Sequence, residues 1–340
     1  MLLLATPQSG HSDIIRVATF DVELSRKGPG LMLRDIARDD PQVGAIAQIV
    51  THVAPDILFL QGVDFDHNLT GAQALRDALT DAGTRYEHVF ALPPNAGLRS
   101  GLDLNGDGRL NGFADNQGYG RFYGDGAMVL LSRWPVHHAG VQDFSGLLWR
   151  DLDGAQLPIE NGAPFPSKQA QAAQRLSSVG HWIVPVMLPD GRQLNLMMFA
   201  AGPPVFDGPE DRNGLRNADE IRLWQVVLDG GLGLPPAPPF VVLGNANLDP
   251  TRGEGRRAAI VNLLSDPRLQ DPHARMGPTV DWSDPTPGDL RVDYVLPSAD
   301  ITVPDAGVVW PRDPAKADAL LMYDGIAASR HRMVWADLEF

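Results

Sequence analysis

Four polar side chains occupy positions where acid–base or phosphoryl-transfer chemistry is commonly found, at the ends of apolar runs. The run from Pro239 to Gly244 is followed by two amides, Asn245 and Asn247. Because side chains alternate along an extended strand, both amides are expected on one face at the edge of a sheet. Two later runs carry Asp293 and His331, the carboxylate and imidazole from which general acid–base catalysis is commonly assembled.

A second polar cluster lies in the segment DLNGDGRLNGFAD, residues 103–115. Oxygen-bearing side chains alternate before Gly108, which permits a sharp turn, as in the opening of an EF-hand calcium loop. Ala114 stands at the twelfth position, where a bidentate Glu is expected, so the next residue would have to replace it. The alternative is a plain Gly/Asn/Asp turn. The predicted Ca²⁺ ligands are Asp103, Asn105, Asp107, the carbonyl of Arg109, Asn111 and Asp115.

The proline-rich segment at 203–214 leads into a predicted helix and carries a third group of charges. Asp211 or Asn213 is expected to cap that helix by accepting its first N–H groups. Arg212 is the residue of this segment that could instead contact an anionic ligand.

The elements that must position these residues follow from hydrophobic periodicity. Helical spacing predicts helices at 40–54, 71–83, 214–230 and 253–266. Buried β-rich runs predict strands at 14–24, 55–63, 125–136, 177–188, 193–202, 239–248, 291–297 and 331–340.

Composition limits the classes of function. The chain has 340 residues, 44% of them hydrophobic, with no cysteine and a net charge of −14. Disulfides, thiolate metal sites and a Cys nucleophile are therefore excluded, and the negative charge disfavours long nucleic acid as a partner. We expect one domain over 14–340, a disordered extension at 1–13, no membrane span, and the cytoplasm by default, with a periplasmic or secreted location left open. The sequence does not determine the oligomeric state.

The order of these motifs resembles the endonuclease/exonuclease/phosphatase superfamily. The resemblance extends from TFDVEL at 19–24 through LSRWP at 131–135 to SRHR at 329–332. It implies an α+β fold: a four-layer α/β/β/α sandwich of two mixed, mostly antiparallel sheets packed face to face. It also implies a divalent-metal-dependent phosphoester hydrolase that uses Mg²⁺ or Mn²⁺.

The sequence departs from the family pattern at several site positions. Asp21 stands at the usual Asn, Gly62 at the metal-binding Glu, and Ala200 at a strand-end His. Asn245 replaces the Asp of Gly-Asp-x-Asn, and Arg330 replaces the Asp before His331. The positive charge of Arg330 is expected to disfavour the protonated imidazole.

Two functions follow from this pattern. The first is a phosphoester hydrolase with a degraded site and weak or absent activity on small or exposed phosphoesters, using His331, Asn247, Asp293, Asn245 and Asp21. Asp64 and Asp66 would rebuild a divalent-cation site near the altered strand ends, or form a solvated turn. The second is a non-catalytic pseudoenzyme that binds a ligand or protein at the same rim.

Overall fold

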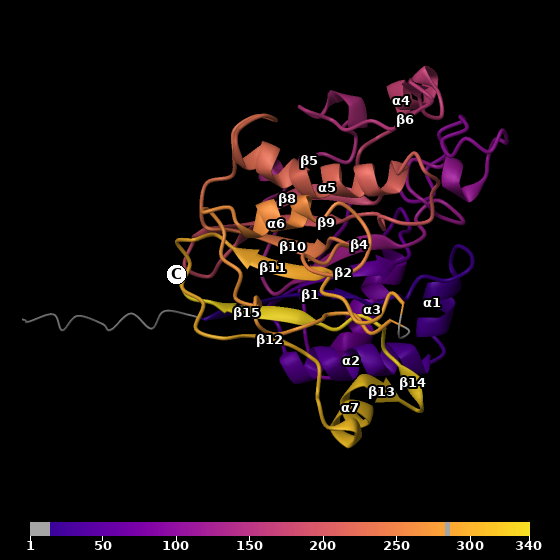
Figure 1. The fold of residues 1–340 in the computed structure, drawn as a ribbon. Helices are drawn as coiled ribbons and strands as arrows, with labels where there is room; N and C mark the ends of the chain where they lie inside the picture. The colour runs from indigo at the N-terminus through magenta and orange to yellow at the C-terminus, as the bar shows by residue number, and fades with distance from the viewer. Residues whose placement is uncertain (1–13, 283–285) are drawn as a thin grey trace, which may run out of the picture.

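Two large β-sheets form the centre of the molecule, and helices cover the outer face of each (Figure 1). The computed structural model describes residues 14–282 and 286–340. The predicted extension at 1–13 lies outside the described residues. No helix in the described part of the chain is long and apolar enough to cross a bilayer.

The first sheet has six strands in the order β12-β15-β1-β2-β4-β3. β1 and β2 are parallel, and the other neighbours are antiparallel. A parallel pair needs a crossover connection, which here contains helices α1 (Leu31–Ile36) and α2 (Pro41–Val53). The strands are β1 (Ile15–Asp21), β2 (Ile57–Val63), β3 (His88–Phe90), β4 (Ala127–Ser132), β12 (Ala306–Val308) and β15 (Val334–Leu338).

The second sheet has five strands in the order β11-β10-β9-β8-β5. Its one parallel pair is β9 and β10, and α5 (Arg212–Leu228) lies in the crossover between them. α6 (Ala258–Leu264) packs beside α5. The strands are β5 (Gln142–Asp143), β8 (Gly180–Met187), β9 (Gln193–Ala200), β10 (Phe240–Asn245) and β11 (Asp293–Pro297).

The remaining helices and strands complete the described chain. They are α3 (Thr70–Asp81), α4 (Lys168–Ala173), α7 (Pro314–Leu321), a hairpin of β6 (Ile159–Glu160) with β7 (Ala163–Pro164), a hairpin of β13 (Met322–Tyr323) with β14 (Ile326–Ala327), and 3₁₀ turns at 113–115, 138–140 and 149–151.

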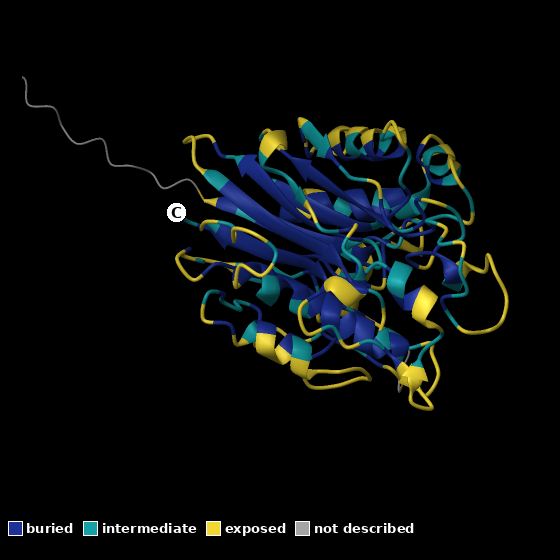
Figure 2. Cartoon of the chain, turned by 90° about the horizontal axis from the view of Figure 1, so that it is seen from above, coloured by how far each residue is buried: buried dark blue, intermediate teal, exposed yellow. Residues whose placement is uncertain are grey.

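Alternation along the strands produces three apolar cores, because successive side chains point to opposite faces. In β1, Val17 faces the second sheet, whereas Ala18 and Phe20 face the layer of α1, α2 and α3. On the second sheet, alternate residues pack between the sheets or against α5 and α6. The sheets appear as a continuous buried layer between the helices in Figure 2.

The structure confirms the predicted α+β, α/β/β/α sandwich with two mixed, mostly antiparallel sheets. All eight predicted strands and all four predicted helices are present. Sequence patterns missed α1, α4, α7 and the strands of two or three residues, which are too short for a hydrophobic period to be recognised.

Gly244 provides a test of the close contact between β9 and β10. Its φ is +139°, and a Cβ there would lie 1.9 Å from the carbonyl oxygen of Phe199. Gly244→Ala should therefore lower the free energy of unfolding by about 3 kcal/mol, measured by urea denaturation. Gly146→Ala is the control, because nothing lies within 4 Å of its added Cβ. Equal stabilities for the two variants would contradict this packing.

Candidate active site

The strand ends that carry the candidate residues meet at one rim of the sandwich. Within the second sheet, Asn245 is the register partner of both Ala200 on β9 and Asp293 on β11. In the first sheet, Asp21 at the end of β1 is paired with Gln61 on β2. Two sheets thus contribute neighbouring polar side chains to one site.

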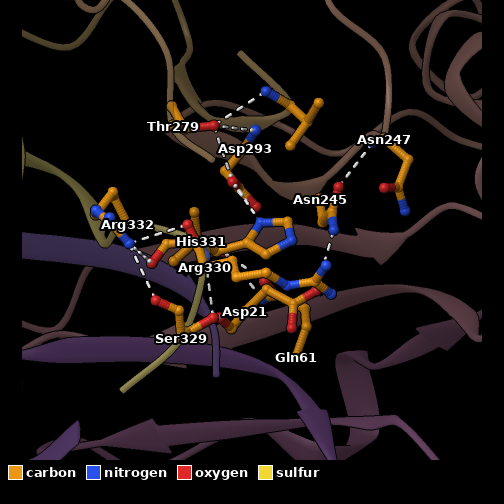
Figure 3. A network of polar contacts seen from close by, with 12 residues as sticks. Asp21, Gln61, Asn245, Asn247, Thr279, Asp293, Ser329, Arg330, His331 and Arg332 are labelled. Atoms are coloured by element: carbon orange, nitrogen blue, oxygen red, sulfur yellow. Dashed lines mark hydrogen bonds and ion pairs between the residues drawn. The ribbon is translucent and has the colours of Figure 1, made fainter. Parts of the chain in front are cut away.

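A hydrogen bond between Asp21 and Asn245 joins the two sheets. The Asn245 amide Nδ2 donates to Asp21 Oδ2 at 3.0 Å, and Asn245 Oδ1 accepts from the backbone N–H of Asn247 at 2.7 Å (Figure 3). Asn247 has a φ of +50°, a left-handed conformation that Asn tolerates, and its side chain donates to the Ala201 carbonyl. Asn245 and Asn247 therefore lie close together, but Asn247 follows the end of β10 and does not continue the alternation of the strand on which the prediction rested.

A second pair, His331 and Asp293, lies beside the first. His331 Nδ1 is 2.9 Å from Asp293 Oδ2, which also accepts a 2.8 Å bond from the Thr279 hydroxyl. His331 is 5% exposed and Asp293 is 1% exposed. The Trp282 ring contacts the imidazole edge to face. Thr279 also accepts the backbone N–H of Asp293, so its hydroxyl binds both the backbone and the side chain of that residue.

The electrostatics favour a protonated His331. Burial opposes the charge, but the carboxylates of Asp293 and Asp21 outweigh it and raise the pKa of His331 to about 9. Burial disfavours the charged form of Asp293 as well, and this raises the pKa of its carboxyl group. The expectation that Arg330 would disfavour the imidazolium is therefore wrong.

The reason lies in the partner of Arg330. Its Nε donates to Glu23 Oε1 at 2.9 Å, and its backbone N–H donates to Glu23 Oε2 at 2.8 Å. The negative charge of the Glu23 carboxylate therefore offsets the positive charge of the guanidinium, which would otherwise disfavour the imidazolium.

The residues at the rim do not fit the divalent-cation site that the resemblance implies. Gly62 stands where a metal-binding Glu is expected, has a φ of +69°, and a Cβ there would lie 2.5 Å from Asp21 Oδ1. The Asp21 carboxylate thus occupies the space that such a side chain would enter. Across the described ranges, no group of three or more His, Cys, Asp or Glu residues is arranged to hold a metal ion.

Asp64 and Asp66 belong to separate networks and do not converge on one ion. Asp64 accepts bonds from the Ser25 hydroxyl and the Arg26 backbone, and burial raises its pKa. Asp66 accepts the backbone N–H groups of Thr70 and Gly71 at the start of α3. A shared cation at these two residues has no support in this geometry.

The predicted calcium loop folds on its own backbone. Asp103 accepts from the N–H groups of Gly106 and Gly108, and Asp107 accepts from Arg109. Asp115 is 3% exposed and accepts from Leu104 and Gly112, so it ties the two ends of the loop together. Ca²⁺ binding at Asp103, Asn105, Asp107, Arg109, Asn111 and Asp115 stays a prediction.

A cleft of about 650 Å³ opens beside the rim, and its lining includes Asp21, Asn245, Asn247 and Ala200. The opposite part of its lining comes from α5, through Arg212, Arg216 and Glu220. The three α5 residues are buried, although long charged side chains are rarely buried without a partner.

Several of these residues escaped sequence analysis. Arg216, Glu220 and Thr279 are polar residues inside runs that read as ordinary amphipathic or loop sequence, and their partners lie far along the chain. The capping prediction for α5 was also wrong. Neither Asp211 nor Asn213 accepts a helix N–H through its side chain; Asp207 accepts the backbone N–H of Asn213, while Asp211 pairs with Arg256.

An imidazole fixed by a carboxylate beside amide donors, at the rim of a two-sheet sandwich, defines a site suited to acid–base and phosphoryl chemistry. Comparison with family models matches residues 18–331 to the Endonuclease/Exonuclease/phosphatase family. The chain belongs to this family, whose members are phosphoesterases that generally use divalent metals.

Solved structures share the fold at low sequence identity. An endonuclease/exonuclease/phosphatase from Beutenbergia cavernae is 17% identical with a TM-score of 0.57, over 96% of this chain and 72% of that one. A family protein from Leptotrichia buccalis is 15% identical with a TM-score of 0.55, over 96% and 100%. Sphingomyelinase C from Streptomyces griseocarneus is 17% identical with a TM-score of 0.52, over 96% and 99%. A comparison with curated proteins gave no significant match.

The His331–Asp293 pair predicts a pH dependence of stability. The pKa of His331 is about 9 in the folded protein and 6.5 in the unfolded chain. A raised pKa contributes stability that is complete below pH 6.5 and is lost as the pH rises through 9, about 3 kcal/mol in all. Urea unfolding from pH 6 to 10 should show this decline.

The control is the double variant His331→Gln/Asp293→Asn, which removes both charges of the pair. Its stability should decline less between pH 6.5 and 9 than that of the parent. The same slope in both proteins would show that the imidazole is not protonated in the folded state.

Proposed function

We propose that the chain is a phosphoester hydrolase of low activity whose proton-accepting carboxylate has moved from one sheet to the other. The supporting observation is the 3.0 Å bond between Asp21 and Asn245. By resemblance, the family places an amide at the first position and a carboxylate at the second. Here the two groups are exchanged, and they are hydrogen-bonded to each other.

The exchange keeps a carboxylate in the cleft beside a protonated imidazole. Asp21 lines the cleft and can accept a proton from water, whereas Asn245 cannot. His331 lies next to Asp21 but outside the residues that line the cleft. Charged at neutral pH, it would stabilise negative charge on a phosphoryl oxygen held beside Asp21 or protonate a leaving group there. Asn247 supplies an amide at the same cleft.

The catalytic groups that the family pattern has and this chain lacks determine how large a loss of rate we expect. Removing one general base or one transition-state donor typically costs about 10²–10⁴ in rate. Gly62 and Ala200 represent two such losses, and losses within one catalytic unit do not multiply. We therefore expect slow turnover.

Hydrolysis of a generic phosphate monoester and a generic diester tests the proposal. We expect His331→Ala and Asp21→Asn each to lower kcat/KM at least 100-fold, because each removes one of the two remaining proton-transfer groups. Asp190→Asn is the matched control, since this exposed turn residue lies before β9, at the opposite end of the strand from Ala200. Turnover unchanged in His331→Ala would show that the cleft is not catalytic.

The swapped pair permits a sharper experiment. Asn245→Asp alone places two carboxylates against each other and should reduce stability and activity. The double variant Asp21→Asn/Asn245→Asp restores the hydrogen bond with the family polarity and should recover activity relative to either single variant. Additive losses in this double-mutant cycle would show that the two residues do not act as a pair.

The non-catalytic alternative has its own support. The altered positions include the expected metal ligand, and the described carboxylates do not form a replacement set. A parent protein with the same background rate as His331→Ala, yet with measurable phosphate binding, would favour a ligand-binding pseudoenzyme.

Calorimetry on a chelator-stripped sample tests directly whether the chain binds divalent cations. Because Asp21 is the rim carboxylate left in the cleft beside Gly62, Mg²⁺ and Mn²⁺ should bind weakly, with no affinity tighter than about millimolar.

If Ca²⁺ occupies the loop at 103–115, binding should be lost in Asp103→Asn/Asp107→Asn. No Ca²⁺ binding below the low-millimolar range would remove the calcium prediction.

A further inference from the structure

An unusual phenylalanine borders the cleft. Phe206 has a φ of +71° and is 87% exposed. A bulky residue in the left-handed region is strained, and an exposed phenyl ring forgoes the free energy of burial. Strain of this kind clusters at functional sites, where it is retained because the side chain is needed in that position.

A second aromatic ring reaches the same cleft from a different loop. Tyr119 is 68% exposed and lines the cleft together with Phe206. Its ring packs edge to face on Phe113, with centroids 6.2 Å apart and an interplanar angle of 81°. This contact supports the tyrosine ring while most of it stays accessible.

A buried guanidinium lies in the wall of the cleft. Arg212 is 8% exposed and forms no ion pair within the described ranges. Its one hydrogen bond to described residues runs from Nη1 to the Leu104 carbonyl at 2.7 Å, and its buried Nε has no partner. A buried charge without an ion-pair partner is costly, and because Nε is enclosed, Nη2 is the atom through which an anion in the cleft would complete its coordination.

The charges around Arg212 limit the size of that anion. The carboxylates of Asp207, Glu210, Asp115 and Asp103 act on the guanidinium electrostatically. They would repel a polyanion, whereas a single phosphoryl group can be held by one guanidinium. The cleft volume of about 650 Å³ is in the range of small-molecule sites.

We propose that this cleft selects small phosphoesters of planar aromatic alcohols, with Phe206 and Tyr119 against the ring and Arg212 at the phosphoryl group. For the reaction, this inference rests on the function proposed above; for binding, it does not. Aromatic rings that border one cleft from two loops favour a flat group by stacking.

The leaving group suits the altered chemistry of the site. Water attacks phosphorus and gives a proton to Asp21, while the bond from phosphorus to the aryl oxygen breaks. The aryl oxide leaves with the electron pair and takes a proton from His331. A phenol has a pKa near 10, as in tyrosine, so it leaves more readily than an alkyl alcohol and demands less of the site.

Binding of two non-hydrolysable probes, measured by calorimetry, separates ring recognition from turnover. Phenylphosphonate and cyclohexylphosphonate carry the same anion and differ in the flatness of the ring. We expect phenylphosphonate to bind at least tenfold more tightly to the parent chain. Phe206→Ala and Tyr119→Ala should each reduce this ratio towards one, and Arg212→Gln should weaken both probes equally.

The controls separate recognition from stability. Leu234→Ala removes an apolar side chain that is 89% exposed near the other end of α5 and should leave the ratio unchanged. Phe206→Gly should raise Tm, because glycine relieves the left-handed strain, and should still abolish the ring preference. Arg212→Lys, which keeps the charge, replaces Arg212→Gln if that variant does not fold.

The result that overturns the proposal is equal affinity for the two phosphonates, or a ratio unaffected by Phe206→Ala and Tyr119→Ala. Adenosine 5′-monophosphate bound more tightly than phenylphosphonate would overturn the aryl assignment in favour of a nucleobase. Because the P–C bonds of the two phosphonates cannot be hydrolysed, absence of catalysis leaves their comparison intact, and absence of ring preference leaves the proposed hydrolase intact.

Discussion

The hydrogen bond between Asp21 and Asn245 is the constraint on which the site depends. It joins the end of β1 in one sheet to the end of β10 in the other, at the rim where the apolar interior of the sandwich stops. The His331–Asp293 bond crosses the same boundary, because Asp293 begins β11 and His331 precedes β15. Polar atoms at this depth need partners, and these pairs supply them from facing sheets. The geometry of the site is therefore a consequence of how the sheets are stacked.

The walls of the cleft are held by a polar face of α5. The Asn217 side chain donates to the carbonyls of Gly202 and Ala246, which follow β9 and β10. The Glu220 carboxylate accepts the backbone N–H groups of Ser178 and Gly202. Burial raises the pKa of Glu220 to about 7 in spite of these bonds. Three loops are thus fixed to one helix, which gives the cleft a defined shape.

The positions at which the sequence analysis expected departures from the family pattern are physically linked in the structure. A Cβ at position 62 would lie 2.5 Å from Asp21 Oδ1 and 2.9 Å from the Glu23 backbone nitrogen, so a glycine with a positive φ fits beside Asp21. Asp21 in turn accepts the amide of Asn245, which a carboxylate at position 245 would repel. Glu23 offsets the charge of Arg330 next to His331. These residues form neighbouring polar contacts at the rim.

The resemblance to the family predicted the sandwich and the position of the site at its rim. Hydrophobic alternation in the sequence predicted the long strands and helices, and strand-end polar residues singled out Asn245, Asn247, Asp293 and His331 as candidates for one site. That information is local, because a strand that is buried on both faces consists of an uninterrupted run of apolar residues. The pairing of Asp21 with Asn245, the partner of Arg330 and the buried charges of α5 were decided by tertiary structure. Their partners are separated by tens to hundreds of residues, and the free energy of a buried charge depends on which groups the fold brings within hydrogen-bond distance.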